Sequence, residues 1–262
     1  MVNCLKNSLK EKLKEGKIVF GVTLGIGSPE VADVLGDIGF DYINFDTQHT
    51  SLSVETIQNM MAAMSYSKST PIMRVISNDL GQINRALDIG AHGVIVPLVN
   101  SKEDAQKAVH AARYSPKGGR SWGPRRVSLR DPEYTETADK EVMVIPQIET
   151  KTAVDNIEQI LSVEELDAIF VGPFDLSMSL GVFQKFESPT FLKAIKTVIS
   201  SCRAHDIAPG LLAPTGPTEV SIKQGFTMIN LGGDSGFIAT AAKDAFDRAK
   251  AAVKTYSPTK AA

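Results

Sequence analysis

Short runs of apolar, often β-branched residues alternate along this chain with segments in which apolar residues recur every three or four positions. The runs predict strands at 18–24, 41–46, 71–76, 93–98, 142–148, 167–172, 207–212 and 227–231. The segments between them predict helices at 29–38, 53–66, 79–89, 101–113, 150–161, 190–205, 217–224 and 235–254. The strands are apolar throughout, as is typical of parallel strands buried on both faces. Eight strand–helix units in about 250 residues predict a (β/α)8 TIM barrel, with a doubly wound open sheet as the alternative.

The chain, 1–262, is expected to form a single domain, because it is 43% hydrophobic and can bury a large core. We expect an N-terminal helix or arm at 1–16 and a tail at 255–262. Helix starts carry capping signals at Ser28-Pro29-Glu30 and at Ser101. The connection 114–141 is long enough to predict a functional loop, which we place over the barrel mouth, near the active site.

Charge and composition narrow the classes of partner. A formal charge of −2 gives no field suited to nucleic acid or to an anionic membrane. The N-terminus lacks the apolar core of a signal peptide, and no stretch reaches the roughly 18 apolar residues of a membrane span. Two cysteines, Cys4 and Cys202, show no metal-binding spacing and no disulfide framework. These features predict a cytoplasmic protein with reduced thiols, acting on small molecules.

Two acidic residues stand at the exits of successive predicted strands. Glu149 closes the run that begins at Val142, and Asp175 follows the run Ala168–Pro173. Because the C-terminal ends of barrel strands meet at one face, the two carboxylates are expected to lie together. Mg²⁺ is commonly held by one or two carboxylates and keeps several waters that a chelating substrate can displace. The pattern therefore predicts a divalent-metal site.

Three further residues are candidates for catalysis. His49 follows the strand 41–46, where it is either a base or an exposed residue of a capped turn. Arg74 lies within an apolar strand, where its burial is costly unless it meets an anion at the active-site end. Asp88 stands near the end of helix 79–89, where the helix dipole disfavours a carboxylate. A histidine partner would offset that cost, and surface exposure is the alternative.

Other chemistries lack their residues. No predicted strand has a lysine in its interior, which argues against Schiff-base catalysis. No Gly-x-Ser-x-Gly elbow or cysteine–histidine pairing indicates a nucleophilic triad.

An ordered series of motifs between about residues 18 and 245 resembles one enzyme family, the HpcH/HpaI aldolases, which are class II, metal-dependent pyruvate aldolases related to citrate lyase β subunits. The motifs are Ile43-Asn44-Phe45-Asp46-Thr47-Gln48-His49, Met73-Arg74-Val75, Ala86-Leu87-Asp88-Ile89-Gly90-Ala91, Gly93-Val94-Ile95-Val96-Pro97, Arg113-Tyr114-Ser115-Pro116-Lys117-Gly118-Gly119-Arg120, Pro146-Gln147-Ile148-Glu149-Thr150 and Val171-Gly172-Pro173-Phe174-Asp175-Leu176-Ser177. The resemblance implies Mg²⁺, Mn²⁺ or Co²⁺ at Glu149 and Asp175 and no organic cofactor. It implies catalysis by His49 paired with Asp88, and contact of Arg74 with the enolate oxygen. The substrate-binding set that we expect is Thr23, Arg74, Gln147, Gly172, Pro173, Phe174, Asp175 and Leu212.

The implied reaction is cleavage of a 4-hydroxy-2-oxoacid to pyruvate and an aldehyde, or its reverse. Two alternative reactions use the same enolate, namely oxaloacetate decarboxylation and a carbon–carbon bond-forming synthase reaction. A third alternative is a non-catalytic protein that binds an oxoacid. Family members are similar in being hexamers, trimers of dimers, with the last helix packed on a neighbouring subunit. The acceptor half departs from the family: Thr23 stands where several members have tryptophan, and Phe174 replaces a usual alanine.

Overall fold

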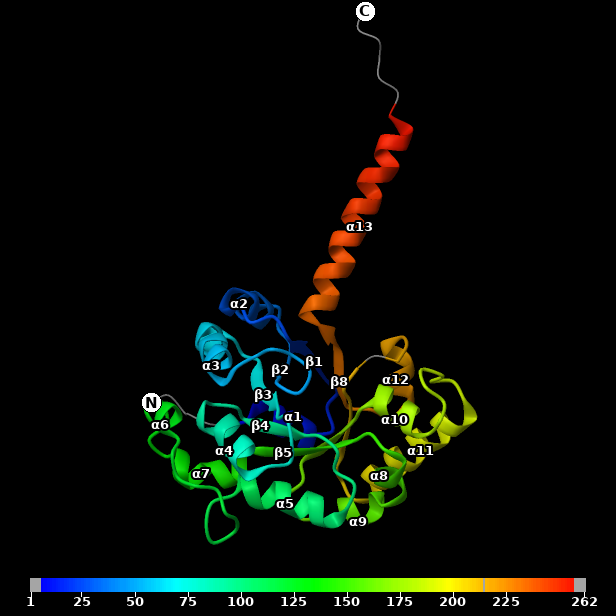
Figure 1. Ribbon diagram of the computed structural model, residues 1–262. Helices are drawn as coiled ribbons and strands as arrows, with labels where there is room; N and C mark the ends of the chain where they lie inside the picture. Colours follow the sequence, from blue (N-terminus) through cyan, green and yellow to red (C-terminus); the bar gives the residue numbers. More distant parts are fainter. Residues whose placement is uncertain (1–5, 214, 257–262) are drawn as a thin grey trace, which may run out of the picture.

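The chain closes into a barrel of eight parallel strands (Figure 1), in a computed structural model that describes residues 6–213 and 215–256. Each strand pairs with the next along the chain, and the last pairs with the first. The predicted (β/α)8 barrel is confirmed, and the open sheet is excluded. The strands are β1 (Val19–Leu24), β2 (Tyr42–Asp46), β3 (Thr70–Arg74), β4 (Gly93–Val96), β5 (Met143–Ile148), β6 (Ala168–Val171), β7 (Ala208–Leu211) and β8 (Met228–Gly233).

Helices cover the outside of the barrel and bury their apolar faces against the strands in one large core cluster. The expected caps form: Ser28 Oγ accepts the N–H of Val31, and Ser101 Oγ accepts that of Asp104. The helices are α1 (Ser8–Lys14), α2 (Pro29–Asp37), α3 (Val54–Ala63), the 3₁₀ turn η1 (Met64–Tyr66), α4 (Leu80–Asp88), α5 (Lys102–Ala112), α6 (Arg125–Ser128), α7 (Tyr134–Glu141), α8 (Lys151–Asp155), α9 (Ile157–Leu161), α10 (Pro173–Ser179), α11 (Pro189–Ala204), α12 (Thr218–Gln224) and α13 (Asp234–Thr255).

The barrel interior has an apolar floor and a polar upper layer. The floor belongs to one cluster with Leu9 and Leu13 of α1, and contains Val19, Tyr42, Ile72, Ile95, Met143, Phe170 and Met228. Because alternate residues of a strand share a face, the same strands turn Asn44, Arg74 and Asn230 inward nearer their C-terminal ends. The interior therefore becomes polar only toward that end.

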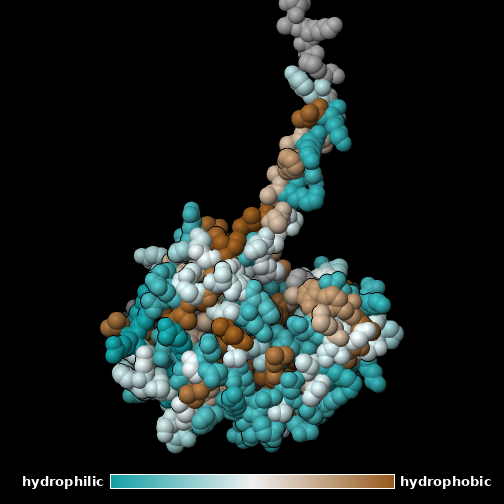
Figure 2. All heavy atoms as spheres, in the orientation of Figure 1, coloured by the Kyte–Doolittle hydropathy of each residue, from teal (hydrophilic) through white to brown (hydrophobic). Residues whose placement is uncertain are grey.

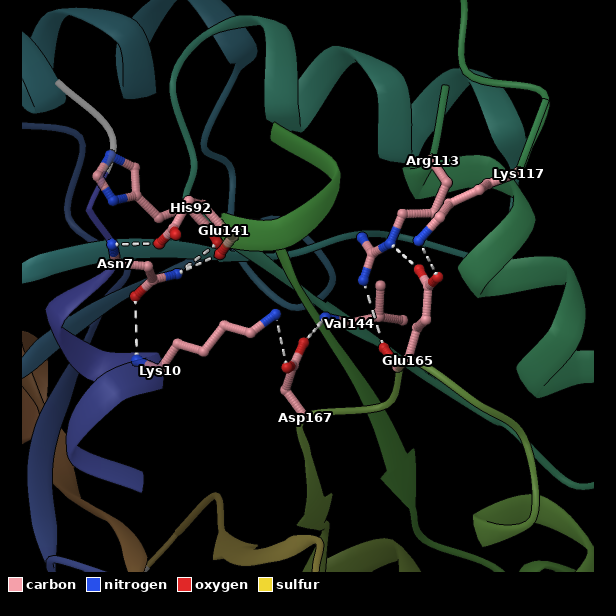
Figure 3. Close-up of polar contacts among 9 residues, drawn as sticks. All are labelled: Asn7, Lys10, His92, Arg113, Lys117, Glu141, Val144, Glu165 and Asp167. Atoms are coloured by element: carbon pink, nitrogen blue, oxygen red, sulfur yellow. Dashed lines mark hydrogen bonds and ion pairs between the residues drawn. The ribbon is translucent and has the colours of Figure 1, made fainter. Parts of the chain in front are cut away.

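Polar contacts fix α1 over the N-terminal end of the barrel (Figure 3). Asn7 Nδ2 donates to the backbone oxygens of His92 and Glu141, at 3.0 and 2.9 Å. Lys10 Nζ lies 2.8 Å from Asp167 Oδ1 in an ion pair whose side chains are 11% and 9% exposed. Burial raises the pKa of Asp167, and Lys10 opposes that rise. This end of the barrel is closed by a helix, so the functional site has to be sought at the other end.

The segment 114–141 does not cover the barrel mouth of its own chain, contrary to our expectation. It contains α6 and α7 and packs on α4, where Arg126 Nη1 donates to the oxygen of Ile89 at 2.7 Å. The reason is topological: the segment connects the end of a helix to the start of a strand, so it emerges at the N-terminal end of the barrel. Its tryptophan, Trp122, is 64% exposed there.

The last helix, α13, projects away from the barrel (Figure 1). Its 22 residues make it about 33 Å long. Apolar side chains are exposed along it and where it leaves the barrel (Figure 2): Phe237, Ile238, Phe246 and Val253. Within the described residues, no helix combines the length and hydropathy that crossing a membrane requires.

Candidate active site

A cavity of about 400 Å³ opens at the C-terminal ends of the strands. Nine of the residues expected from the sequence line it: Thr23, His49, Arg74, Gln147, Gly172, Pro173, Phe174, Asp175 and Leu212. Four lining residues were not expected, namely Ala213, Asn230, Gly232 and Gly233. Three of these come from β8, whose exit the sequence analysis left without a role.

Glu149 lies against Gly172 at the edge of this cavity and is 2% exposed. A Cβ atom on Gly172 would come within 2.9 Å of Glu149 Oε2, so this position has no room for a side chain. Glu149 Oε1 accepts the N–H of Leu98 at 2.7 Å, and Oε2 accepts from Gln147 Nε2. Leu98 has φ +54°, a left-handed backbone that is uncommon for leucine and that directs its N–H at the carboxylate.

The electrostatics of Glu149 and Asp175 fit a bound cation. Burial raises the pKa of Glu149; hydrogen bonds from Leu98 and Gln147 lower it, and the neighbouring charge of Asp175 raises it. A dication would offset both the burial and the repulsion. No group of three or more His, Cys, Asp or Glu side chains suited to a metal occurs among residues 6–213 and 215–256. Two carboxylates are the donor set that Mg²⁺ uses when water and substrate complete its coordination.

Arg74 forms a two-point ion pair with Asp46, which the sequence analysis did not predict. Arg74 Nε donates to Asp46 Oδ1 at 2.9 Å and Nη2 donates to Oδ2 at 2.6 Å. The two side chains are 10% and 5% exposed. Their contact follows from the strand register, which places Asp46 beside Arg74. Two of the five guanidinium N–H donors are used here, so others remain for a substrate in the cavity.

His49 is held at the cavity by its backbone. Its N–H points at Asp46 Oδ1, 3.4 Å away, and the same oxygen accepts the N–H of Gln48 at 3.0 Å. Asp46 therefore orders both the arginine and the turn that carries the histidine. The imidazole itself is exposed and lines the cavity, so it can exchange protons with a bound molecule.

Asp88 does not meet His49 within one chain. It ends α4, at the N-terminal end of the barrel, where Arg120 Nη2 donates to Asp88 Oδ1 at 3.0 Å. Arg120 is buried between the rings of Tyr114 and Tyr134, 4.5 and 5.4 Å from their centroids. Arg120, and not a histidine, thus compensates the unfavourable position of the Asp88 carboxylate at the C-terminus of a helix. His49 lies at the opposite end of the same barrel.

Phe174 forms part of the cavity rim and packs on the insert before α11. Its ring lies edge-on to Phe186, with centroids 5.4 Å apart, and Phe186 lies 5.4 Å from Phe191. The large residue at this position is therefore accommodated by a neighbouring aromatic cluster. It is 41% exposed, so it also remains available to a bound acceptor.

The family model for HpcH/HpaI aldolase/citrate lyase matches residues 21–241. The chain belongs to this family. It is 35% identical over 244 residues to the 4-hydroxy-2-oxo-heptane-1,7-dioate aldolase of Shigella sonnei, covering 91% of this chain and 93% of that protein. A family protein from Burkholderia cenocepacia superposes with a TM-score of 0.87 at 27% identity, covering 94% and 100% of the two chains. The citrate synthase SbnG superposes with a TM-score of 0.85 at 30% identity, covering 95% and 100%. The chain is therefore a carbon–carbon lyase.

Proposed function

We propose that this enzyme cleaves and forms 4-hydroxy-2-oxoacids through the enolate of pyruvate, with an aldehyde as the second product. One observation carries the proposal: the cavity gathers Arg74, His49 and Asp175, with Glu149 at its edge. These residues supply a charged donor, a proton acceptor and two metal-type ligands in one place. Such a set suits stabilisation of an enolate.

Glu149 and Asp175 are the residues that would hold the divalent metal ion, Mg²⁺, Mn²⁺ or Co²⁺. When bound, the ion supplies a Lewis acid that polarises the 2-oxo group of the substrate. Gln147 orients Glu149 through its Nε2 donor. We propose that no organic cofactor takes part.

The carboxylate of the oxoacid is proposed to bind at the start of α10. The N–H of Gly172 is used by the oxygen of Ile148, and Pro173 has none. The N–H groups of Phe174 and Asp175 lie in the first helical turn, where no acceptor exists within the helix. Leu212 adds apolar surface to the same part of the cavity.

The protons are moved by the chain's own groups. In cleavage, His49 accepts the proton of the C4 hydroxyl, the C3–C4 bond breaks, and the electron pair remains on pyruvate as its enolate. Arg74 donates to the enolate oxygen, where negative charge develops. Return of the proton to C3 completes pyruvate and restores His49. Condensation follows the same steps in reverse.

A pairing of His49 with Asp88 requires two subunits, because the residues lie at opposite ends of one barrel. We propose the hexamer of the resemblance, a trimer of dimers. The exposed apolar residues of α13 support it, as does the apolar groove of about 310 Å³ that Phe237 and Ile238 form with Val31, Val34 and Leu35 of α2. Co-assembly of His49→Ala with Asp88→Ala chains should restore activity that neither chain has alone. No recovery in mixed oligomers would remove Asp88 from the mechanism.

A synthase or oxaloacetate decarboxylase is the second candidate. The likeness to the citrate synthase SbnG favours it, since that match covers 95% of this chain. A purely oxoacid-binding protein has no need for His49 and the Arg74–Asp46 pair. We propose the cytoplasm as the location.

The experiment is to follow release of pyruvate from a 4-hydroxy-2-oxoacid and from oxaloacetate, with and without Mg²⁺ or Mn²⁺. An aldolase gives pyruvate and an equal amount of aldehyde from the first substrate. If the enzyme turned over oxaloacetate but not the 4-hydroxy-2-oxoacid, its activity would be that of a decarboxylase and not of an aldolase.

A further inference from the structure

An asparagine beside the active site joins the exits of two neighbouring strands. Asn100 lies in the segment that follows β4, and Glu149 directly follows β5, which pairs with β4. Asn100 Nδ2 donates to the backbone oxygen of Leu98 at 3.0 Å. Asn100 Oδ1 accepts from the hydroxyl of Thr150, the residue after Glu149. One amide thus uses both its oxygen and its nitrogen to hold the two strand exits together.

The position of Asn100 is itself fixed by contacts with the ends of α5, α8 and α9. Its N–H donates to Asp104 Oδ2 at 2.9 Å, in the first turn of α5. Its carbonyl oxygen accepts from Asn156 Nδ2 at 2.8 Å, between α8 and α9. Its partner Thr150 is the N-cap of α8, where Oγ1 accepts the N–H of Ala153 at 3.0 Å. The amide of Asn100 is therefore well anchored.

The backbone of Leu98 needs such support. At φ +54° the Cβ of a leucine is crowded by its own backbone, so this conformation is unfavourable unless other contacts hold it. The side chain is 57% exposed, so its packing contributes little to that hold. Asn100 holds the carbonyl of Leu98, and the positive φ then directs the Leu98 N–H at Glu149 Oε1, 2.7 Å away. A leucine released to a negative φ would turn this N–H away from the carboxylate.

Both oxygens of the Glu149 carboxylate have a fixed donor. Oε1 accepts from the Leu98 N–H, and Oε2 accepts from Gln147 Nε2. Each carboxylate oxygen has two lone pairs, so one on each oxygen remains for a cation. Outer residues that hydrogen-bond a metal ligand orient it, and their loss typically weakens metal binding by about 10- to 100-fold. The donor from Leu98 belongs to the backbone, so only the segment that carries it can place it.

Resting on the proposed role of Glu149 as a metal ligand, we propose that Asn100 is a positioning residue of the metal site. It keeps Leu98 in the left-handed conformation, and the Leu98 N–H orients the Glu149 carboxylate toward the ion. Asn100 acts through these two residues, because it does not line the cavity. An amide suits this role, since its nitrogen holds Leu98 while its oxygen holds Thr150.

The test measures the binding of Mn²⁺ by calorimetry and, separately, urea unfolding in EDTA, in the full-length protein. Asn100→Ala should weaken Mn²⁺ binding by about tenfold or more. Adding Leu98→Gly to Asn100→Ala should recover much of the affinity, because glycine adopts a positive φ without steric cost. Asn7→Ala is the matched control: Asn7 also joins separate segments through its amide, but at the N-terminal end of the barrel. It should lower the unfolding free energy and leave the Mn²⁺ affinity at the wild-type value.

Two results would overturn the proposal. One is wild-type Mn²⁺ affinity in Asn100→Ala. The other is a loss of affinity that Leu98→Gly does not reduce, because Asn100 would then not act through the backbone of Leu98.

Thr150 provides a second comparison, which stands even if Asn100→Ala fails to fold. Thr150→Val removes the hydroxyl that holds Asn100 and should weaken Mn²⁺ binding, whereas Thr150→Ser keeps the hydroxyl and should retain the affinity. Equal affinities in these two variants would contradict the proposal. Absence of Mn²⁺ binding in wild type, or unchanged affinity in Glu149→Gln, would instead contradict the proposed metal site itself.

Discussion

The buried ion pair between Asp46 and Arg74 should be the most sensitive point of the active site. Asp46→Asn keeps the size of the side chain but removes its charge and turns one acceptor into a donor. Arg74 would then remain buried, at 10% side-chain exposure, without its counter-ion. The turn that carries His49 would lose part of its anchor as well. The substitution should therefore reduce both stability and activity.

The magnitude follows from the burial. Removing one partner of a buried pair costs about 3–5 kcal/mol of unfolding free energy, because the other charge is left uncompensated. For a chain of this size that is a fall in Tm of roughly 6–20 °C. Asp155→Asn is the matched control, since its pair with Lys151 is 57% and 62% exposed and should contribute about 0.5 kcal/mol or less.

The assay is urea unfolding followed by circular dichroism, at one protein concentration and in EDTA, so that neither assembly nor metal binding differs between variants. Asp46→Asn with Arg74→Gln should recover part of the loss, because no charge is then left unpaired. Equal unfolding free energies for Asp46→Asn and Asp155→Asn would refute the view that this pair is a buried, interdependent unit.

Other predictions concern Arg74, the metal ligands and His92. Arg74→Lys keeps the charge but loses the planar fork, so kcat should fall by about 10²-fold or more; full activity would make Arg74 a structural residue. EDTA should abolish turnover, and added Mn²⁺ should restore it. Glu149→Gln or Asp175→Asn should weaken the binding of Mn²⁺ measured by calorimetry. Unchanged Mn²⁺ affinity in both variants would show that these two residues are not the metal ligands. Burial lowers the pKa of His92 to about 4 from an ordinary value near 6.5. Between these pH values His92 is protonated in the unfolded chain and neutral in the folded chain. Up to about 3 kcal/mol of unfolding free energy should therefore be lost as the pH falls from 6.5 to 4. His92→Gln should flatten that part of the stability–pH curve, and an unchanged slope would contradict it.

The barrel could be predicted because parallel strands that are buried on both faces leave continuous apolar runs, and because helices need a different period. The position of Glu149 could be predicted too, because a carboxylate directly after a buried strand lies at the C-terminal end of the barrel. The partner of Arg74 could not. It depends on the register between β2 and β3, which no local pattern contains.

Two expectations depend on the end of the barrel at which a residue lies. Asp88 and the segment 114–141 were both expected at the active site, but each lies just before a strand, so within one chain both are at the N-terminal end of the barrel, away from the cavity. Thr23 was expected at the cavity, but its hydrogen bonds with Asn44 and Asn230 were not, because three neutral residues on separate strands carry no signal until the barrel closes.

The most direct test of the central claim is exchange of the C3 protons of pyruvate for deuterium, followed by NMR in deuterated buffer. It isolates formation of the enolate from the choice of aldehyde. The account predicts exchange that requires Mg²⁺ or Mn²⁺, stops with EDTA, and is lost in Glu149→Gln and Asp175→Asn. Exchange that persists in metal-stripped enzyme, or no exchange in metal-loaded wild type, would contradict a metal-dependent enolate mechanism at this site.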